Sequence, residues 1–215
     1  LTVDYLSAWL PNRSSLGLEG SIRGGRDLDL AIYGGHVDLS LVQKLVPQAE
    51  MTGFGDFEGT VQGDLANPQV EVSFSAMHGK FFKQPYDTLK IKAGGSLDGV
   101  HVDDFLLEKD GQQTWFVQGT VGFAGEKKLN LRIDTKGARM EDVAALVAPD
   151  RPITGNVDNV VQLTGTLDNP EGVGYVHFYR GSYAGVLLSG MDGDYFLHDG
   201  VVRLQDFHLF SPMID

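Results

Sequence analysis

The chain has 215 residues and a formal net charge of −12, from 17 Lys and Arg against 29 Asp and Glu. This acidic balance argues against a nucleic-acid partner and against attachment to anionic lipid headgroups, because both need a basic surface. The absence of cysteine excludes disulfides and cysteine-based metal sites. The 28 glycines show no three-residue period, so they indicate many strand ends and tight bends rather than collagen.

Three short segments are apolar at helical spacing, and each is followed by a proline within a residue or two. They are Val3–Leu10, Asp38–Val46 and Met140–Val147. An acidic residue opens the second segment, where the helix dipole favours negative charge. We therefore predict helices of one or two turns at these points, held by packing because helices this short are unstable alone.

Most of the remaining chain alternates between apolar and polar residues, which predicts β-strands with one apolar face. The alternating runs are Val70–Ala76, Leu89–Ala93, Trp115–Phe123, Leu129–Ile133 and Gly174–Tyr179. Glycine-rich turns are predicted between such runs, at Ala93-Gly94-Gly95, Asp110-Gly111 and Asp199-Gly200. The expected fold class is all-β, an elongated, curved antiparallel sheet folded into an open apolar groove, with short helices interspersed.

An internal repeat appears when the sequence is shifted by 102 residues. Gly63-Asp64-Leu65-Ala66-Asn67-Pro68 then falls on Gly165-Thr166-Leu167-Asp168-Asn169-Pro170, and Thr52-Gly53 falls on Thr154-Gly155. We interpret the Asn-Pro of each copy as a structural corner, because proline cannot continue a central ladder.

The repeat divides the chain into parts of a series of ~100-residue units. Residues 1–52 would be the tail of one unit, 53–153 a complete unit and 154–215 the head of the next. Because the chain begins at Leu1 rather than Met and ends just after a strand-like run, we interpret it as a piece of a longer protein. Targeting segments would then lie outside it.

No residue pattern predicts catalysis, and we expect no enzyme and no cofactor. The six histidines form no H-E-x-x-H motif and are interpreted as turn and strand-surface residues; a metal site would need residues to converge from distant strands. His101 has Asp103 and Asp104 nearby, but those two carboxylates would point to opposite faces of a strand. No Gly-x-Ser-x-Gly elbow, P-loop or calcium nonapeptide is present.

The order of these weak motifs resembles the TamB family, within the wider AsmA-like group of bacterial envelope proteins. The shared order is a short helix before proline, Thr-Gly, Gly-x-Leu-x-Asn-Pro, an alternating strand, Gly-x-Phe/Tyr and Asp-Phe-x-Leu, most specifically over residues 52–107 and 154–209. The resemblance implies a periplasmic β-sheet groove in a protein anchored in the inner membrane of a diderm bacterium. It also implies transport of phospholipid toward the outer membrane, and an Omp85-type barrel partner.

By that resemblance the inward alternate residues line the groove, where they would hold phospholipid or another amphiphile. The expected lining residues are Val70, Val72, Phe74, Leu89, Ile91, Val117, Val121, Phe123, Leu129, Leu131, Ile133, Val176 and Phe178. An acyl chain would gain about 0.8 kcal/mol for each methylene buried there.

Two other functions stay open at this point. An exposed sheet edge could add a strand from a nascent outer-membrane barrel protein, making the chain a scaffold for barrel assembly and secretion. An adhesin or carbohydrate-binding solenoid would need repeats of ~20–30 residues with stacked aromatics, and the sequence does not show them.

Overall fold

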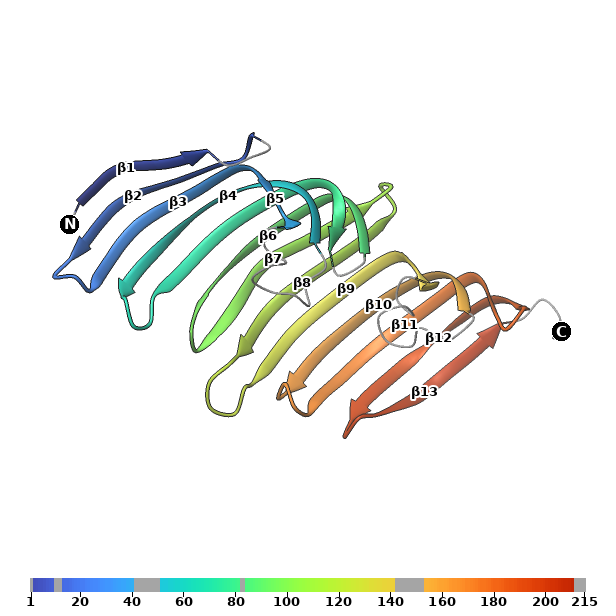
Figure 1. Ribbon diagram of the computed structural model, residues 1–215. Coiled ribbons are helices and arrows are strands. Elements are labelled where there is room, and N and C mark those ends of the chain that lie inside the picture. Colours follow the sequence, from blue (N-terminus) through green and yellow to red (C-terminus); the bar gives the residue numbers. More distant parts are fainter. Residues whose placement is uncertain (1, 10–12, 41–50, 82–83, 142–152, 211–215) are drawn as a thin grey trace. The chain divides into compact units, whose positions relative to one another are not determined.

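The computed structural model describes residues 2–9, 13–40, 51–81, 84–141 and 153–210. Over these residues the fold is all-β: thirteen strands hydrogen-bond in chain order and form one open antiparallel sheet (Figure 1). The chain divides into two compact units, one of residues Leu1–Leu107 with Gly122–Gly125 and one of Glu108–Val121 with Glu126–Asp215. The expected all-β class and antiparallel sheet are confirmed.

The first unit holds seven strands, each joined to the next in the sheet. Their bounds are β1 Thr2–Trp9, β2 Ser15–Arg23, β3 Asp27–Asp38, β4 Met51–Asp64, β5 Gln69–Phe81, β6 Gln84–Ser96 and β7 Gly99–Lys109. The second unit holds six strands in the same arrangement. Their bounds are β8 Gln113–Gly122, β9 Leu129–Arg139, β10 Ile153–Gly165, β11 Pro170–Tyr183, β12 Val186–His198 and β13 Val201–Phe210.

Two predictions of local structure are wrong. The helix expected over Val3–Leu10 is strand β1 wherever the structure describes it, and Leu6 lies opposite Leu18 of β2. Pairing with a neighbouring strand therefore overrides the helical spacing of its apolar residues. The turn expected at Ala93-Gly94-Gly95 lies inside β6, whereas Asp110-Gly111 and Asp199-Gly200 do form turns.

The other two predicted helices are described only at their starts. Asp38 ends β3 and Ser40 has helical geometry, while Met140 and Glu141 are helical after β9. The rest of Asp38–Val46 and of Met140–Val147 lies outside the described residues.

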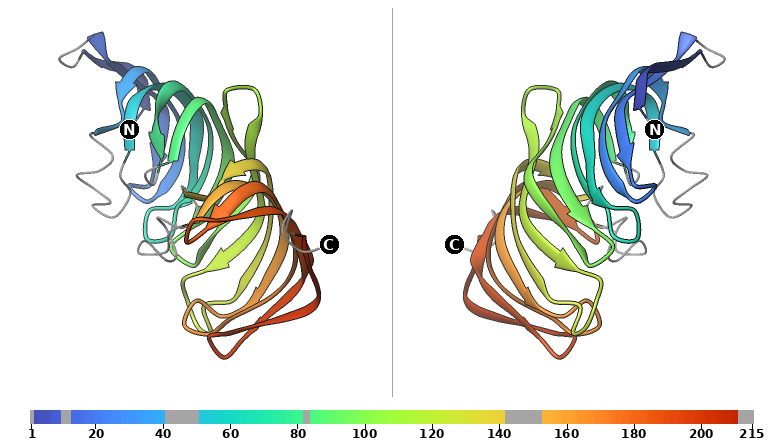
Figure 2. Two further views of the ribbon diagram at one scale, coloured as in Figure 1. Left: turned by 90° about the vertical axis from the view of Figure 1, so that its right-hand side faces the viewer. Right: turned by 90° about the vertical axis from the view of Figure 1, so that its left-hand side faces the viewer.

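The strands of each unit bend along their length (Figure 2), and β-bulges occur at matching places. Register shifts fall between Thr52 and Phe54 where β4 meets β5, and between Thr154 and Asn156 where β10 meets β11. The intervening glycines, Gly53 and Gly155, have φ angles of 112° and 132°, which strain any other residue. A bulge adds a residue to one strand and increases its local bend.

A second pair of bulges is held by a carboxylate. His36 and Gly137, with φ angles of 51° and 57°, donate their backbone N–H groups to Asp56 Oδ1 at 2.8 Å and Asp158 Oδ1 at 2.7 Å. Asp56 and Asp158 are 102 residues apart in the sequence. The same device thus stabilises a left-handed backbone position in each unit.

The Asn-Pro corners connect successive hairpin turns. Asn67 Nδ2 donates to Asp98 at 2.8 Å in the first unit, and Asn169 Nδ2 donates to Asp199 at 3.2 Å in the second. In both units the turn before the alternating strand is therefore tied to the turn two strands further on.

Candidate functional site

The apolar side chains of the first unit gather on one face of the sheet, here called the apolar face. Antiparallel register places Val72 opposite Ala93 and Phe74 opposite Ile91, and directly opposed residues share a face. On the other side of β5, Val70 lies opposite Val61 of β4. The apolar face therefore continues across three neighbouring strands.

All five predicted lining residues of β5 and β6 lie on this face. Val70, Val72, Phe74 and Ile91 are half-buried, so part of each side chain is accessible. Leu89, at 0% exposure, contributes packing and offers no free surface.

Phe123 lies at one end of the same face, but it is not in a strand as the alternation suggested. Strand β8 ends at Gly122, and the Phe123 N–H donates to Asp98 O at 2.8 Å. Phe123 is 50% exposed and lines a depression of about 350 Å³ with Val70, Val72, Ala93 and Val100. Apolar side chains and glycine backbone make up almost all of this depression.

The predicted lining residues of the second unit also share a face. Val117 lies opposite Ile133 and Val121 opposite Leu129 in the pairing of β8 with β9. Leu131 lies opposite Leu163 of β10, and Phe178 lies opposite Val157. Leu129 and Phe178 are buried, while the other five predicted residues are half-buried.

A polar pair interrupts the apolar face of the second unit. Val176 lies opposite Asn159, whose Oδ1 accepts a hydrogen bond of 2.8 Å from Tyr195 Oη. The Tyr195 ring passes over Gly174, where a Cβ atom would lie 2.5 Å from Cζ. Burial raises the pKa of Tyr195, while the hydrogen bond from Tyr195 to Asn159 lowers it. No pattern along the chain predicts this pair, because it joins two strands that are not adjacent, β10 and β12.

The opposite face of the first unit is polar and carries charges of both signs. A hollow of about 570 Å³ on this face is lined by residues that include Asp56, Glu58, Lys90 and Lys92. The corresponding face of the second unit has a hollow of about 690 Å³ with Arg132, Asp134 and Asp158 among its lining residues. These hollows lie on the side of the sheet that the alternation assigns to solvent.

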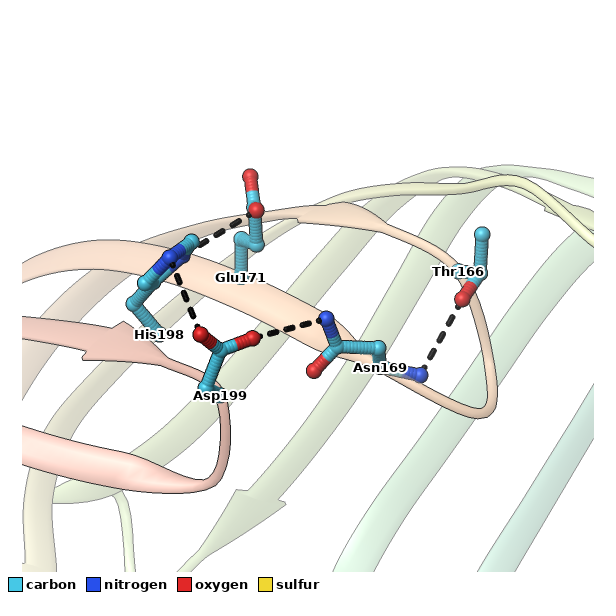
Figure 3. A network of polar contacts seen from close by, with 5 residues as sticks. All are labelled: Thr166, Asn169, Glu171, His198 and Asp199. Carbon is cyan, nitrogen blue, oxygen red and sulfur yellow. Dashed lines mark hydrogen bonds and ion pairs between the residues drawn. The ribbon is translucent and has the colours of Figure 1, made fainter.

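Histidines on the strands and turns have carboxylate neighbours both along the chain and on other strands. His198 lies between Glu171 and Asp199 (Figure 3): its Nδ1 is 3.1 Å from Glu171 Oε1 and its Nε2 is 3.3 Å from Asp199 Oδ2. Asp199 also accepts the Asn169 hydrogen bond of the corner, and the Asn169 N–H donates to Thr166 Oγ1 at 3.0 Å. This network joins two hairpin turns.

A row of three polar side chains crosses β11, β12 and β13. His177 and His208 lie opposite Asp192 on either side, with Nδ1–Oδ distances of 4.0 and 3.2 Å. In the first unit, His101 of β7 lies near Glu71 of β5 and Asp103 of β7. Register across strands, rather than spacing along the chain, brings each group together.

Within the described residues, no helix has the length and apolar character that crossing a bilayer requires. Comparisons with models of protein families, with curated proteins and with solved structures found no match.

Proposed function

We propose that the apolar face binds the acyl chains of phospholipid or a similar amphiphile, as a periplasmic segment of a TamB-like protein of the diderm envelope. The observation that carries the proposal is the apolar face itself, which presents half-buried Val, Ile, Leu and Phe side chains in both units. Exposed apolar surface of this kind marks ligand or partner sites.

The depression at Phe123 is the most favourable place for a chain to bind. Its lining of Val70, Val72 and Phe123 would remove methylene groups from water, at about 0.8 kcal/mol for each one buried. Four or five methylenes would therefore contribute about 3–4 kcal/mol before the cost of ordering the chain. Such modest affinity suits a surface that must release its cargo.

The test uses a photo-crosslinkable fatty acid and native mass spectrometry of the gently purified chain. We expect capture by the wild type, and at least about fivefold less capture by Val72→Asp, because a carboxylate on this face must lose water when a chain covers it. The matched control is Ser73→Asp, one residue along β5 and exposed on the opposite face. Ser73→Asp should capture as the wild type does.

A second variant separates lost binding from lost folding. Phe123→Asp changes a half-exposed side chain outside the strands, where substitutions seldom unfold a protein. It should also reduce capture while leaving the circular dichroism spectrum unchanged. Equal capture by Val72→Asp and Ser73→Asp, or none by the wild type, would contradict the proposal.

In the whole protein, this segment would pass phospholipid between an inner-membrane anchor and an Omp85-type barrel in the outer membrane. The predicted repeat supports this role, because matching backbone features recur at positions 101 or 102 residues apart. Stacked units would extend the apolar face from one repeat to the next.

A second candidate function is a scaffold for outer-membrane barrel assembly. The observation that favours it is that the antiparallel sheet is open rather than closed into a barrel. An open sheet can add a strand from another protein, and β13 carries exposed apolar side chains at Val202, Leu204 and Leu209. A photo-crosslinker at Leu204 should then capture barrel precursors, whereas one at Val72 should capture lipid.

A further inference from the structure

A histidine and two carboxylates meet on the polar face of the first unit. Glu71 of β5 lies opposite Gly94 of β6, and its carboxylate occupies the space that a side chain at Gly94 would fill. Glu71 thereby crosses β6 and reaches His101 of β7. Asp103 is two residues further along β7, so it shares a face with His101.

The distances among these groups are close to those of a metal centre. His101 Nε2 is 3.4 Å from Glu71 Oε1 and 4.0 Å from Asp103 Oδ1, and one ligand atom from each residue lies within 4.8 Å of the others. Zinc–ligand bonds of 2.0–2.1 Å in a tetrahedron place neighbouring ligand atoms about 3.3 Å apart. The Glu71 oxygen is already near this spacing from His101 Nε2, and the Asp103 oxygen would have to move closer. With that movement, the three atoms would occupy three corners of a zinc tetrahedron.

The chemistry of the set suits zinc. One imidazole nitrogen and two carboxylate oxygens suit Zn²⁺, whose charge would balance the two carboxylates. Each of the three side chains is partly exposed, which leaves room for water as the fourth ligand. Binding through Nε2 requires that the proton of the neutral ring be on Nδ1.

We propose that Glu71, His101 and Asp103 bind Zn²⁺ on the polar face of the first unit. This inference is independent of lipid binding, which concerns the opposite face. The site belongs to the first unit alone, because the positions 102 residues further on hold Val173, Arg203 and Gln205. One high-affinity ion per chain is therefore expected.

His198 supplies a matched control. It also lies between two carboxylates, but it approaches Glu171 through Nδ1 and Asp199 through Nε2. Ring nitrogens on different edges cannot direct both carboxylates to one ion, whereas His101 directs a single nitrogen to both of its neighbours.

The test is a titration of the 215-residue chain with Zn²⁺ by calorimetry, together with NMR of the histidine ring nitrogens. His101→Ala and Glu71→Gln should each weaken binding at least about tenfold, as losses around zinc sites commonly do. His198→Ala should bind as the wild type does, and Zn²⁺ should shift the His101 Nε2 resonance before any other histidine nitrogen.

Two results would overturn the proposal. One is equal weakening by His101→Ala and His198→Ala, which would indicate scattered binding to surface histidines. The other is a folded Glu71→Gln variant that binds Zn²⁺ as tightly as the wild type, which would show that Glu71 is not a ligand.

Discussion

Each unit has a pair of glycines covered by an aromatic ring, but the ring comes from a different strand in each unit. In the first unit, the Tyr86 ring of β6 lies over Gly53 and Gly79, and Tyr86 Oη donates to Thr52 O at 3.0 Å. In the second unit, the Phe178 ring of β11 lies over Gly155 and Gly181. Tyr86 and Phe178 are only 2% and 1% exposed.

At the equivalent positions of the other unit, 102 residues away, each aromatic residue is replaced by a smaller apolar one. Ala76 stands where the second unit has Phe178, and Leu188 stands where the first unit has Tyr86. Each unit thus pairs one aromatic residue with one smaller apolar residue, so the filled volume is retained while its source changes strand. The backbone bulges recur, but the side chains that pack on them are interchangeable in position.

The largest expected effect comes from removing either aromatic ring. Tyr86→Ala and Phe178→Ala should each lower the free energy of unfolding by about 3–5 kcal/mol, because each leaves a cavity over a glycine pair. Urea denaturation gives the loss, and hydrogen exchange shows which unit is affected.

Transferring the second unit's arrangement to the first sharpens this comparison. Ala76→Phe should destabilise through overpacking and Tyr86→Leu through a cavity, whereas the double variant should lose less than the sum of the two. Strict additivity would show that the two positions do not share one space.

A smaller effect is expected at the bulge carboxylates. Asp158 accepts two partly buried hydrogen bonds, one from the Gly137 N–H and one of 3.3 Å from Tyr179 Oη. Asp56 accepts one hydrogen bond, from the His36 N–H, and that bond is exposed. Asp158→Ala should therefore cost about 2 kcal/mol and Asp56→Ala about 1 kcal/mol in urea denaturation. Asp158→Asn keeps an acceptor oxygen and should cost less than Asp158→Ala; equal losses at both positions would contradict the difference in burial.

The smallest effect is a pH dependence that Tyr86 contributes and that Phe178, which has no ionisable group, does not. Burial raises the pKa of Tyr86 above the ordinary tyrosine value of about 10. The folded state then holds this proton more tightly than the unfolded chain, so its contribution is complete below pH ~10 and is lost as pH rises through the folded-state pKa. Phe178 has no such group.

Tyr86→Phe should accordingly reduce the loss of stability between pH 9 and about 11, measured by urea denaturation at a series of pH values. It should also cost about 1 kcal/mol at neutral pH, because the hydrogen bond to Thr52 O is lost. An unchanged alkaline slope would show that Tyr86 ionises as readily in the folded state as in the unfolded chain.

Alternation along the chain was sufficient to predict most strands and the face that each side chain occupies. Val72 and Ile91 could be assigned to one face because strand side chains alternate with period two, whatever the neighbouring strand is. The Asn67 and Asn169 corners could be predicted for a similar reason, since a proline acts on the backbone next to it. Such local rules need no knowledge of distant residues.

Only the tertiary structure decided how the strands pair and which side chains make contact across them. Strand β1 forms where a helix was expected because β2 provides its hydrogen-bonding partner, and Gly94 extends β6 where a turn was expected. The meeting of Glu71 with His101 and the pairing of Tyr195 with Asn159 each span two strands and at least 30 residues. Sheet register sets such contacts, and register depends on every bulge and turn between the partners.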